Sequence, residues 1–137
     1  MSLTEQNKDI VRRYQDALNR NDLAALDDLV AADIATPAML PGFASGLAGI
    51  KQIHLATLDA WPDVQTEIVD LIAEGDEVVA RIVMTATPQK DFVGIPATGK
   101  SFRMNGMYAV RIANGEIVEH RGVEDAVGML RQLGAIQ

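Results

Sequence analysis

The amino-acid sequence predicts one α+β domain, with three N-terminal helices packed on a curved antiparallel sheet and a short C-terminal helix. Two periodicities support this fold class. Up to residue 60, apolar residues recur three and four positions apart, the pattern of amphipathic helices. After Pro62 the pattern alternates with a period of two, which is typical of strands. No repeat or linker interrupts the 137 residues, so we expect a single domain spanning 1–137.

Three helices are expected before residue 62. The first covers Thr4–Asn19, with Thr4 as its N-cap. Asp22 can cap a short second helix, whose predicted buried stripe is Leu23, Leu26, Leu29 and Val30. Residues 35–47 contain two prolines and two glycines and are expected to form a loop. The third helix should run from about Leu47 to Ala60, and Pro62 ends it.

The remaining chain is predicted to form four strands and one helix. The expected strands are Val64–Ala73, Glu77–Thr87, Ser101–Ile112 and Glu116–Gly122. Asn114-Gly115 between the last two strands is a strong hairpin signal. Asp125 should cap the final helix and Gly134 should end it.

Strand alternation assigns the two faces of the sheet. Met84, Met104 and Tyr108 fall on the inward face. On the last strand, Val118, His120 and Gly122 are expected to point inward together, and we expect no acid at the inward positions of the later strands. The outer face of the 77–87 strand is rich in apolar residues for a solvated surface, with Val79, Arg81, Val83 and Thr85. This predicts a homodimer formed through the outer sheet face.

Composition excludes several function classes. With 19 acidic and 12 basic residues the net charge is -7, which argues against a nucleic-acid partner. The absence of cysteine excludes disulfides and a thiolate nucleophile, and two histidines leave little material for a metal site, so we expect neither metal nor cofactor. No apolar run approaches the roughly 20 residues of a membrane span, and the polar start does not resemble a signal peptide. A cytoplasmic location is therefore expected.

Four segments resemble the SnoaL-like polyketide cyclases of the NTF2-like superfamily, whose cone-shaped domains also include the ketosteroid isomerases. They are IVRRYQDALNRNDLAALDDLVAADI, AWPD, VGIPATGKSF and GEIVEHRGVEDAVGMLRQLG, so the resemblance covers nearly the whole chain. It implies an NTF2-like cone around an apolar pocket for a small hydrophobic ligand. One such fold hosts isomerases, cyclases, epoxide hydrolases and non-catalytic modules.

The resemblance also implies where catalytic groups would lie. The cyclases' acid/base aspartate on the last strand falls at Gly122, and their histidine on the preceding strand falls at Tyr108. In the ketosteroid isomerases, two hydrogen-bond donors to one oxyanion fall at Tyr14 and Tyr108. The isomerases' general base would fall near residues 36–38, where this chain has no carboxylate.

Tyr14, Tyr108 and His120 are therefore the candidate catalytic residues. The tyrosines would stabilise an oxyanion, and His120 would move the proton that the missing carboxylate would otherwise move. The alternative is structural: two core tyrosines in a mutual or water-mediated hydrogen bond, and one satisfied histidine. The neighbouring acid Glu124 is not expected to substitute by position, and Asp125 is expected to serve as a helix cap.

Five further residues are candidates for binding the substrate, namely His54, Trp61, Met84, Met104 and Gly122. Methionines on the inward face suit a flat apolar ligand because their side chains adapt in shape. The alternatives are surface exposure for His54 and ordinary core packing for Trp61. The favoured function is a cofactor-independent isomerase- or cyclase-type enzyme acting on a hydrophobic carbonyl or enolisable compound. A non-catalytic ligand-binding module is the alternative, and an epoxide hydrolase is less favoured because it needs acids inside the cone.

Overall fold

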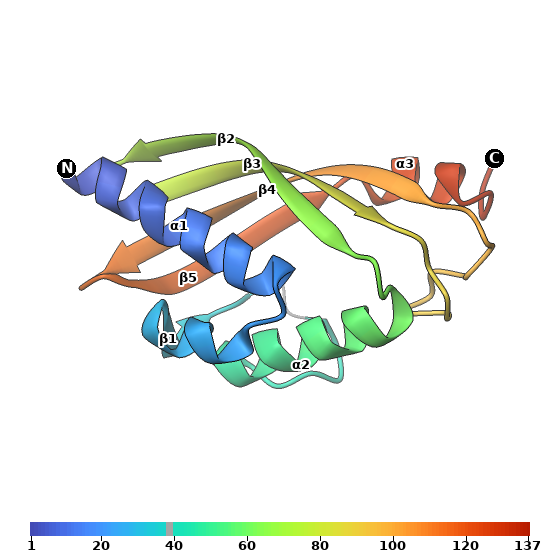
Figure 1. The fold of residues 1–137 in the computed structure, drawn as a ribbon, viewed down its shortest axis with the longest axis horizontal. Helices are drawn as coiled ribbons and strands as arrows, with labels where there is room; N and C mark the ends of the chain where they lie inside the picture. Colours follow the sequence, from blue (N-terminus) through green and yellow to red (C-terminus); the bar gives the residue numbers. More distant parts are fainter. Residues whose placement is uncertain (38–39) are drawn as a thin grey trace.

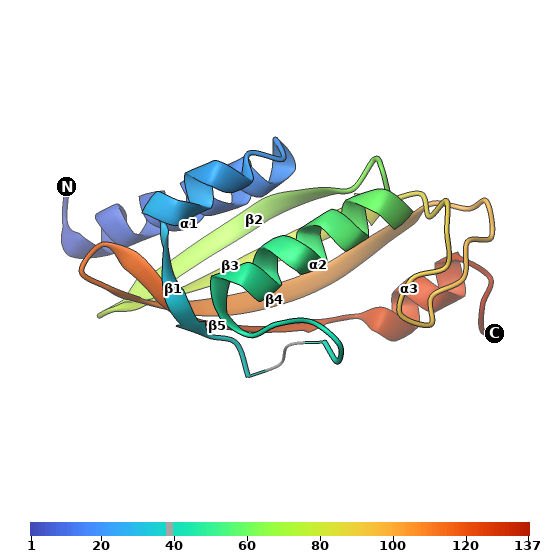
Figure 2. The same cartoon turned by 90° about the horizontal axis from the view of Figure 1, so that it is seen from below.

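The computed structural model describes residues 1–37 and 40–137, and its α+β class confirms the prediction. Helices α1 and α2 lie on the same side of one five-stranded sheet, and α3 lies at the far end of the long axis (Figures 1 and 2). The elements, in chain order, are α1 (Leu3–Asn19), η1 (Leu23–Asp28), β1 (Val30–Ala35), α2 (Gly46–Ala60), β2 (Gln65–Glu74), β3 (Glu77–Ala86), β4 (Phe102–Ala113), β5 (Glu116–Glu124) and α3 (Ala126–Gln132). No helix in the described ranges has both the length and the apolar character to cross a bilayer.

The first helix begins earlier than the sequence predicts. Ser2, rather than Thr4, is the N-cap of α1, and its side chain accepts a hydrogen bond from the Glu5 amide at 3.2 Å. Asn19 ties the other end of α1 to the sheet. Its amide side chain donates to the Thr66 carbonyl at 2.8 Å and accepts from the Thr66 amide at 3.0 Å. This pairing fixes the position of α1 over β2.

The expected second helix is only partly helical. Leu23–Asp28 forms a short 3-10 helix capped by Asp22, and the chain then continues as strand β1. Val30, predicted to lie on a helix, instead pairs with Ile117 of β5. The pairing is parallel, so the sheet is mixed rather than wholly antiparallel as predicted. The 3-10 helix ends at Asp28, so the backbone N–H and C=O groups of the following apolar residues need other hydrogen-bond partners. They find them on the edge strand β5.

The four predicted strands are present within one to two residues of their expected bounds, in the sheet order β1-β5-β4-β3-β2. Asn114 and Gly115 have φ of 52° and 79° at the turn between β4 and β5, as a tight hairpin of the expected type requires. The loop predicted for 35–47 begins one residue later, after Ala35, and ends where α2 starts at Gly46. Ala38 and Met39 within it lie outside the described residues.

A β-bulge in β5 sets which side chains face α1 and α2. Ile112 pairs with Ile117 but Arg111 pairs with Glu119, so Val118 is an extra residue in β5. Ile117 is completely buried, and beyond the bulge the inward positions become His120, Gly122 and Glu124. Val118 itself has no partner on β4, so the strict alternation behind the predicted inward set of Val118, His120 and Gly122 does not hold between Ile117 and Glu119.

Two clusters of buried side chains form the core. The larger lies between α1, η1, β1 and the sheet and includes Val11, Leu26 and Val78. The smaller lies where α3 meets the sheet and contains Trp61 and Met104. Each cluster takes some of its residues from the inward positions of β3 and β4, as the alternation predicts.

Gly46 lets α2 start against the backbone of β1. Its φ is 73°, and a Cβ atom built there would lie 2.7 Å from the Ala32 carbonyl oxygen. Gly75, in the turn between β2 and β3, also has a positive φ of 58°, but a Cβ atom there would meet nothing within 4 Å. Both glycines have a positive φ, but only Gly46 lies against another segment of the backbone.

We expect Gly46→Ala to lower the free energy of unfolding by about 2–4 kcal/mol, because it adds a backbone clash to the strain of a positive φ. Gly75→Ala is the matched control and should cost only the conformational term, about 1 kcal/mol. Urea denaturation of both variants measures the difference. Equal destabilisation would contradict the close approach of α2 and β1.

The outer face of the sheet carries exposed apolar side chains on β2, β4 and β5. Ile72 of β2 is 66% exposed, and Met107 and Val123, which are Cα partners on β4 and β5, are 43% and 72% exposed. Charged residues of both signs lie beside them, such as the ion pair of Arg81 with Asp70 at 2.6 Å. A surface with both charges can in principle face a second copy of itself.

The sequence-based expectation of a homodimer through this face leads to a direct test. Met107→Asp should place a charge in the contact and shift the protein from dimer to monomer, as measured by light scattering after size-exclusion chromatography. Leu55→Asp, on the exposed side of α2, is the control and should leave the mass unchanged. A dimer that persists in Met107→Asp, or a monomeric wild type, would rule out this interface.

Candidate functional site

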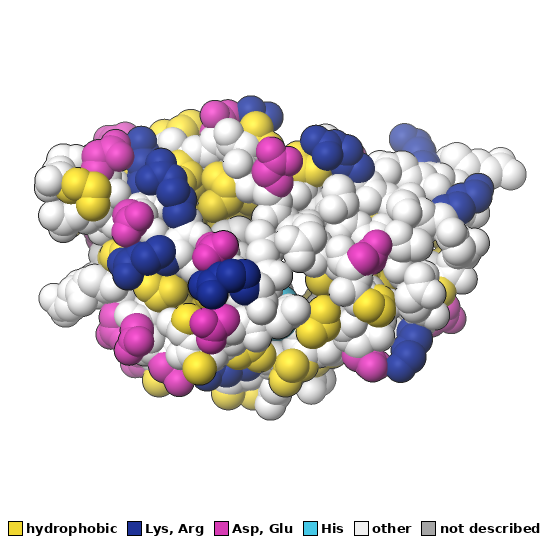
Figure 3. Space-filling view, in the orientation of Figure 1, with side chains coloured by type: hydrophobic (Ala, Val, Ile, Leu, Met, Phe, Trp, Pro, Cys, Tyr) yellow, Lys and Arg dark blue, Asp and Glu magenta, His cyan; other side chains and the backbone are white. Residues whose placement is uncertain are grey.

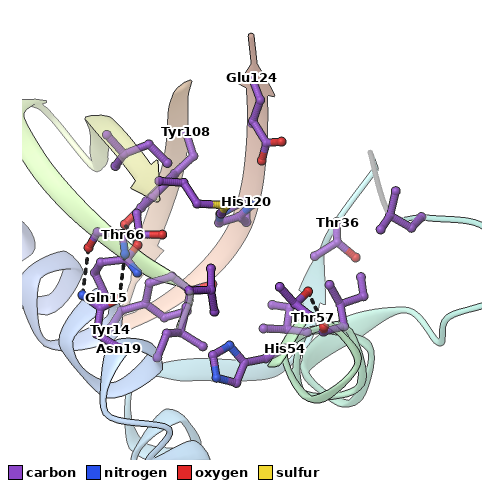
Figure 4. A pocket seen from close by; sticks show the side chains of 18 of the residues that line it. Tyr14, Gln15, Asn19, Thr36, His54, Thr57, Thr66, Tyr108, His120 and Glu124 are labelled. Carbon is purple, nitrogen blue, oxygen red and sulfur yellow. Dashed lines mark hydrogen bonds between the residues drawn. The ribbon is translucent and has the colours of Figure 1, made fainter. Parts of the chain in front are cut away.

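A pocket of about 520 Å³ lies between α1, α2 and the inner face of the sheet. Figure 3 shows a hollow near the centre of the corresponding face, with yellow apolar side chains around it. Its apolar lining includes Leu18, Leu40, Ile50, Ile53, Val64, Ile82 and Met84. Its polar lining is Tyr14, Gln15, Asn19, Thr36, His54, Thr57, Thr66, Tyr108, His120 and Glu124 (Figure 4). A mostly apolar cavity of this size with a few convergent polar groups is typical of a small-molecule site.

Tyr14 of α1 and Tyr108 of β4 meet inside this pocket. Their ring centroids are 6.3 Å apart and the rings are nearly perpendicular. The two hydroxyls do not form the mutual hydrogen bond that the structural alternative allowed. Instead the Tyr108 hydroxyl donates to Oε1 of Gln15 at 3.2 Å. Gln15 therefore orients one of the two tyrosines from the same helix that carries the other.

Burial keeps both tyrosines in their neutral, hydrogen-bond-donating form. Removal from water raises the pKa of Tyr14 to about 12. The pKa of Tyr108 is also raised, first by burial and then by the nearness of Tyr14. A pair of neutral hydroxyls in a largely dry site can donate to a developing oxyanion without itself ionising.

His120 of β5 completes an aromatic group with the tyrosines. Its ring stacks on Tyr108 with centroids 4.9 Å apart, and it lies 6.2 Å from Tyr14. Burial lowers its pKa, because the charged imidazolium loses more from desolvation than the neutral ring. Near pH 7 the imidazole is therefore neutral, which is the form that can accept a proton.

Glu124 also lines the pocket, two residues beyond Gly122 on the inward face of β5. The expectation that the inward positions of the later strands carry no acid is therefore wrong. The period-two pattern of His120 and Gly122 continues to residue 124 and could have identified it, but the predicted strand ended at Gly122. Glu124 lies on an exposed stretch of β5, and the burial that it does have raises its pKa.

Gln15 is the second residue that the sequence analysis missed. It is buried, with 7% of its surface exposed, and follows Val11 by four positions on α1. A glutamine on the buried face of an amphipathic helix indicates a polar contact in the interior, because a buried amide needs hydrogen-bond partners.

Most of the predicted ligand-binding residues line the pocket, and two do not. His54, Met84 and Gly122 are in its wall. Trp61 and Met104 belong to the smaller core cluster instead, where the Trp61 ring packs edge-on against Phe92 and Phe102 at 5.5 and 5.2 Å. The inward alternation is correct for Met104, but α3 covers that end of the sheet, so the residue packs in the core.

His54 and Thr36 add polar groups on the α2 and β1 sides. His54 Nε2 lies 2.9 Å from Asn21 Oδ1, so the ring is held by a hydrogen bond and not simply solvated, and burial lowers its pKa. The Thr36 hydroxyl oxygen is buried without a hydrogen-bond partner among the described residues. Within 1–37 and 40–137, no three His, Asp or Glu side chains gather closely enough to share a metal ion.

Comparison with known proteins gives consistent matches. The family model described as SnoaL-like polyketide cyclase matches residues 8–133. The chain is 30% identical over 122 residues to nogalonic acid methyl ester cyclase of Streptomyces nogalater, covering 86% of this chain and 90% of that protein. It is 25% identical over 135 residues to aklanonic acid methyl ester cyclase DnrD of Streptomyces peucetius, covering 92% and 89%.

Solved structures agree with these matches. IdmH from Streptomyces antibioticus superposes with a TM-score of 0.83 at 32% identity, covering 94% of this chain and 99% of that one. TsrD from Streptomyces laurentii superposes with a TM-score of 0.88 at 25% identity, covering 99% and 100%.

The lowered pKa of His120 predicts a pH dependence of stability. The unfolded chain binds a proton near the ordinary pKa of 6.5, whereas the folded chain binds it only at lower pH. The free energy of unfolding should therefore fall as pH drops from 6.5 to the folded pKa, and His120→Gln should remove that part of the loss. Urea titrations of both proteins and NMR titration of the imidazole measure it. An NMR pKa above 6.5 for His120 would contradict the buried, neutral ring.

Proposed function

The chain belongs to the SnoaL-like polyketide cyclase family, and we propose that it is a cofactor-independent enzyme that moves a proton on a hydrophobic, enolisable carbonyl compound. The observation that carries the proposal is the convergence of Tyr14, Tyr108 and His120 in one pocket, with ring centroids 4.9–6.3 Å apart. Two neutral donors and one neutral base are the groups that enolate chemistry needs.

In the proposed reaction, the free nitrogen of the neutral His120 ring takes a proton from the carbon next to the substrate carbonyl. The electron pair of the broken C–H bond passes to the carbonyl oxygen, which becomes an enolate. Tyr14 and Tyr108 donate hydrogen bonds to that oxygen, and Tyr108 exchanges its Gln15 acceptor for the stronger, charged one. The imidazolium then gives the proton to a carbon of the enolate, which restores the carbonyl group and returns His120 to its neutral form.

The same enolate can close a ring. Its carbon attacks a second carbonyl of the same molecule, a C–C bond forms, and the new alkoxide takes the proton from His120. Two curated relatives are named as cyclases of methyl esters, of nogalonic acid and of aklanonic acid. The pocket of this chain, about 520 Å³ and largely apolar, is of a size that suits a compact multi-ring substrate of this kind.

A ligand-binding module without catalysis is the second candidate. It is favoured by Gly122, which has no side chain where the resemblance places the cyclases' aspartate. The remaining pocket carboxylate, Glu124, lies two residues further along β5. In that case the tyrosines would hold a phenol or ketone, and His120 would serve only as a wall of the pocket.

One experiment with two readouts separates these candidates. Wild type should bind phenols of graded pKa with preference for phenolate, followed by ultraviolet absorbance, and should accelerate exchange of the α-hydrogens of 2-tetralone in D₂O, followed by NMR. Tyr14→Phe or Tyr108→Phe should weaken phenolate binding by about ten- to a hundredfold, as loss of a hydrogen bond to a charged group implies. His120→Gln should slow exchange by about a hundredfold or more and spare binding.

Trp61→Phe, which alters an aromatic ring in the other core cluster, is the control and should change neither readout. Phenolate binding that depends on the tyrosines, without any exchange, would favour the binding module. Absence of both would refute the proposed function.

A further inference from the structure

Glu124 is held at the end of β5 by its neighbours on β4. Gly106 of β4 is its Cα partner, and a Cβ atom on Gly106 would lie 3.3 Å from Glu124 Cγ. The Glu124 side chain therefore lies over β4 at a position where the glycine leaves room for it. The Asp125 amide donates to the Asn105 carbonyl at 2.9 Å and fixes the backbone directly after it. Asp125 then caps α3 by accepting from the Gly128 amide at 2.9 Å.

Glu124 lies further along β5 than His120, beyond Gly122, and both line the same pocket. Four residues along a strand correspond to about 13 Å between Cα atoms. Figure 4 shows both side chains on the same strand, with the Glu124 carboxylate directed along the strand toward His120. Gly122 lies between them in the pocket wall, and a Cβ atom built there would lie 3.8 Å from Cε1 of the His120 ring, so that ring leans over the glycine. A flat ligand that contacts the tyrosines can therefore extend past His120 along β5 as far as Glu124.

The carboxylate of Glu124 has no ion-pair partner in the described part of the chain, and its pKa is shifted by burial alone. Glu119 differs in this respect, although it is on the same strand. It faces outward and is paired with Arg121 at 2.9 Å and with Arg111 at 3.4 Å. Among the described residues that line the pocket there is no lysine or arginine, so a ligand meets an uncompensated acceptor at this end.

We propose that Glu124 determines specificity by binding a hydrogen-bond donor, a hydroxyl or a protonated amine, at the end of the ligand remote from the tyrosines. The inference rests on the proposed function for the orientation of the ligand, whose oxyanion end lies at Tyr14 and Tyr108. An ionised carboxylate accepts hydrogen bonds and donates none, so a ligand end that only accepts gains nothing there.

The test uses naphthols that differ only at the far end. The probes are 2,6-dihydroxynaphthalene, 6-aminomethyl-2-naphthol and 6-methoxy-2-naphthol, with a donor, a cation and an acceptor respectively at that end. Affinities at pH 7.5 are measured by calorimetry for wild type, Glu124→Gln and the control Glu119→Gln. We expect wild type and Glu119→Gln to bind the ammonium probe about three- to tenfold more tightly than the methoxy probe, with the dihydroxy probe between them.

Glu124→Gln should bring the ammonium and methoxy probes to within about twofold of each other, because the charge of the partner is removed. Unchanged ranking in Glu124→Gln, while Tyr108→Phe still weakens every probe, would overturn this inference and leave the proposed function intact. If no probe binds in a manner that depends on the tyrosines, both fail. A loss of ranking in Glu119→Gln as well would assign the effect to general surface charge and would also overturn the inference.

Discussion

The single extra residue in β5 determines what this pocket contains. Without the bulge at Val118, the alternation that buries Ile117 would carry Glu119 and Arg121 inward and turn His120 away from the tyrosines. A pair of charged side chains would then face an apolar cavity, at a high desolvation cost. The bulge comes soon after the hairpin turn at Asn114-Gly115, and the residues on either side of it, Ile117 and Glu119, both pair with β1. Local geometry at one position thus keeps Glu119 and Arg121 outside and places His120 beside the tyrosines.

The inner end of the pocket, at Tyr14, Tyr108 and His120, is polar but uncharged. The burial that keeps it uncharged also affects the basicity of His120. Burial keeps Tyr14 and Tyr108 protonated and His120 unprotonated, so the group holds donors and an acceptor without an ion. In the proposed reaction, the same burial weakens His120 as a base, since a lowered pKa reduces the affinity of its ring for a proton. Tyrosines that stabilise the enolate lower the cost of that transfer from the substrate side.

Much of this arrangement could be predicted from sequence, and the failures have local causes. The period-two pattern of β3 and β4 correctly indicated the inward side of Met84 and Tyr108, because these strands pair without interruption. Strand β1 was missed because six residues beside a helical turn give no clear period. Glu124 was missed because the strand extends two residues past the glycine at which it was expected to end. The hydrogen bond from Tyr108 to Gln15 joins residues 93 positions apart, and no local pattern indicates such a contact.

The placement of Trp61 has a practical consequence for spectroscopy. It is the only tryptophan in the sequence, and its ring lies between Phe92 and Phe102 in the cluster that α3 covers, outside the wall of the pocket. Its intrinsic fluorescence is therefore a local probe of the α3 end of the molecule. A change in emission when a ligand binds in the pocket would indicate that the packing of the smaller cluster changes on binding. Unchanged emission would indicate that the surroundings of Trp61 stay the same.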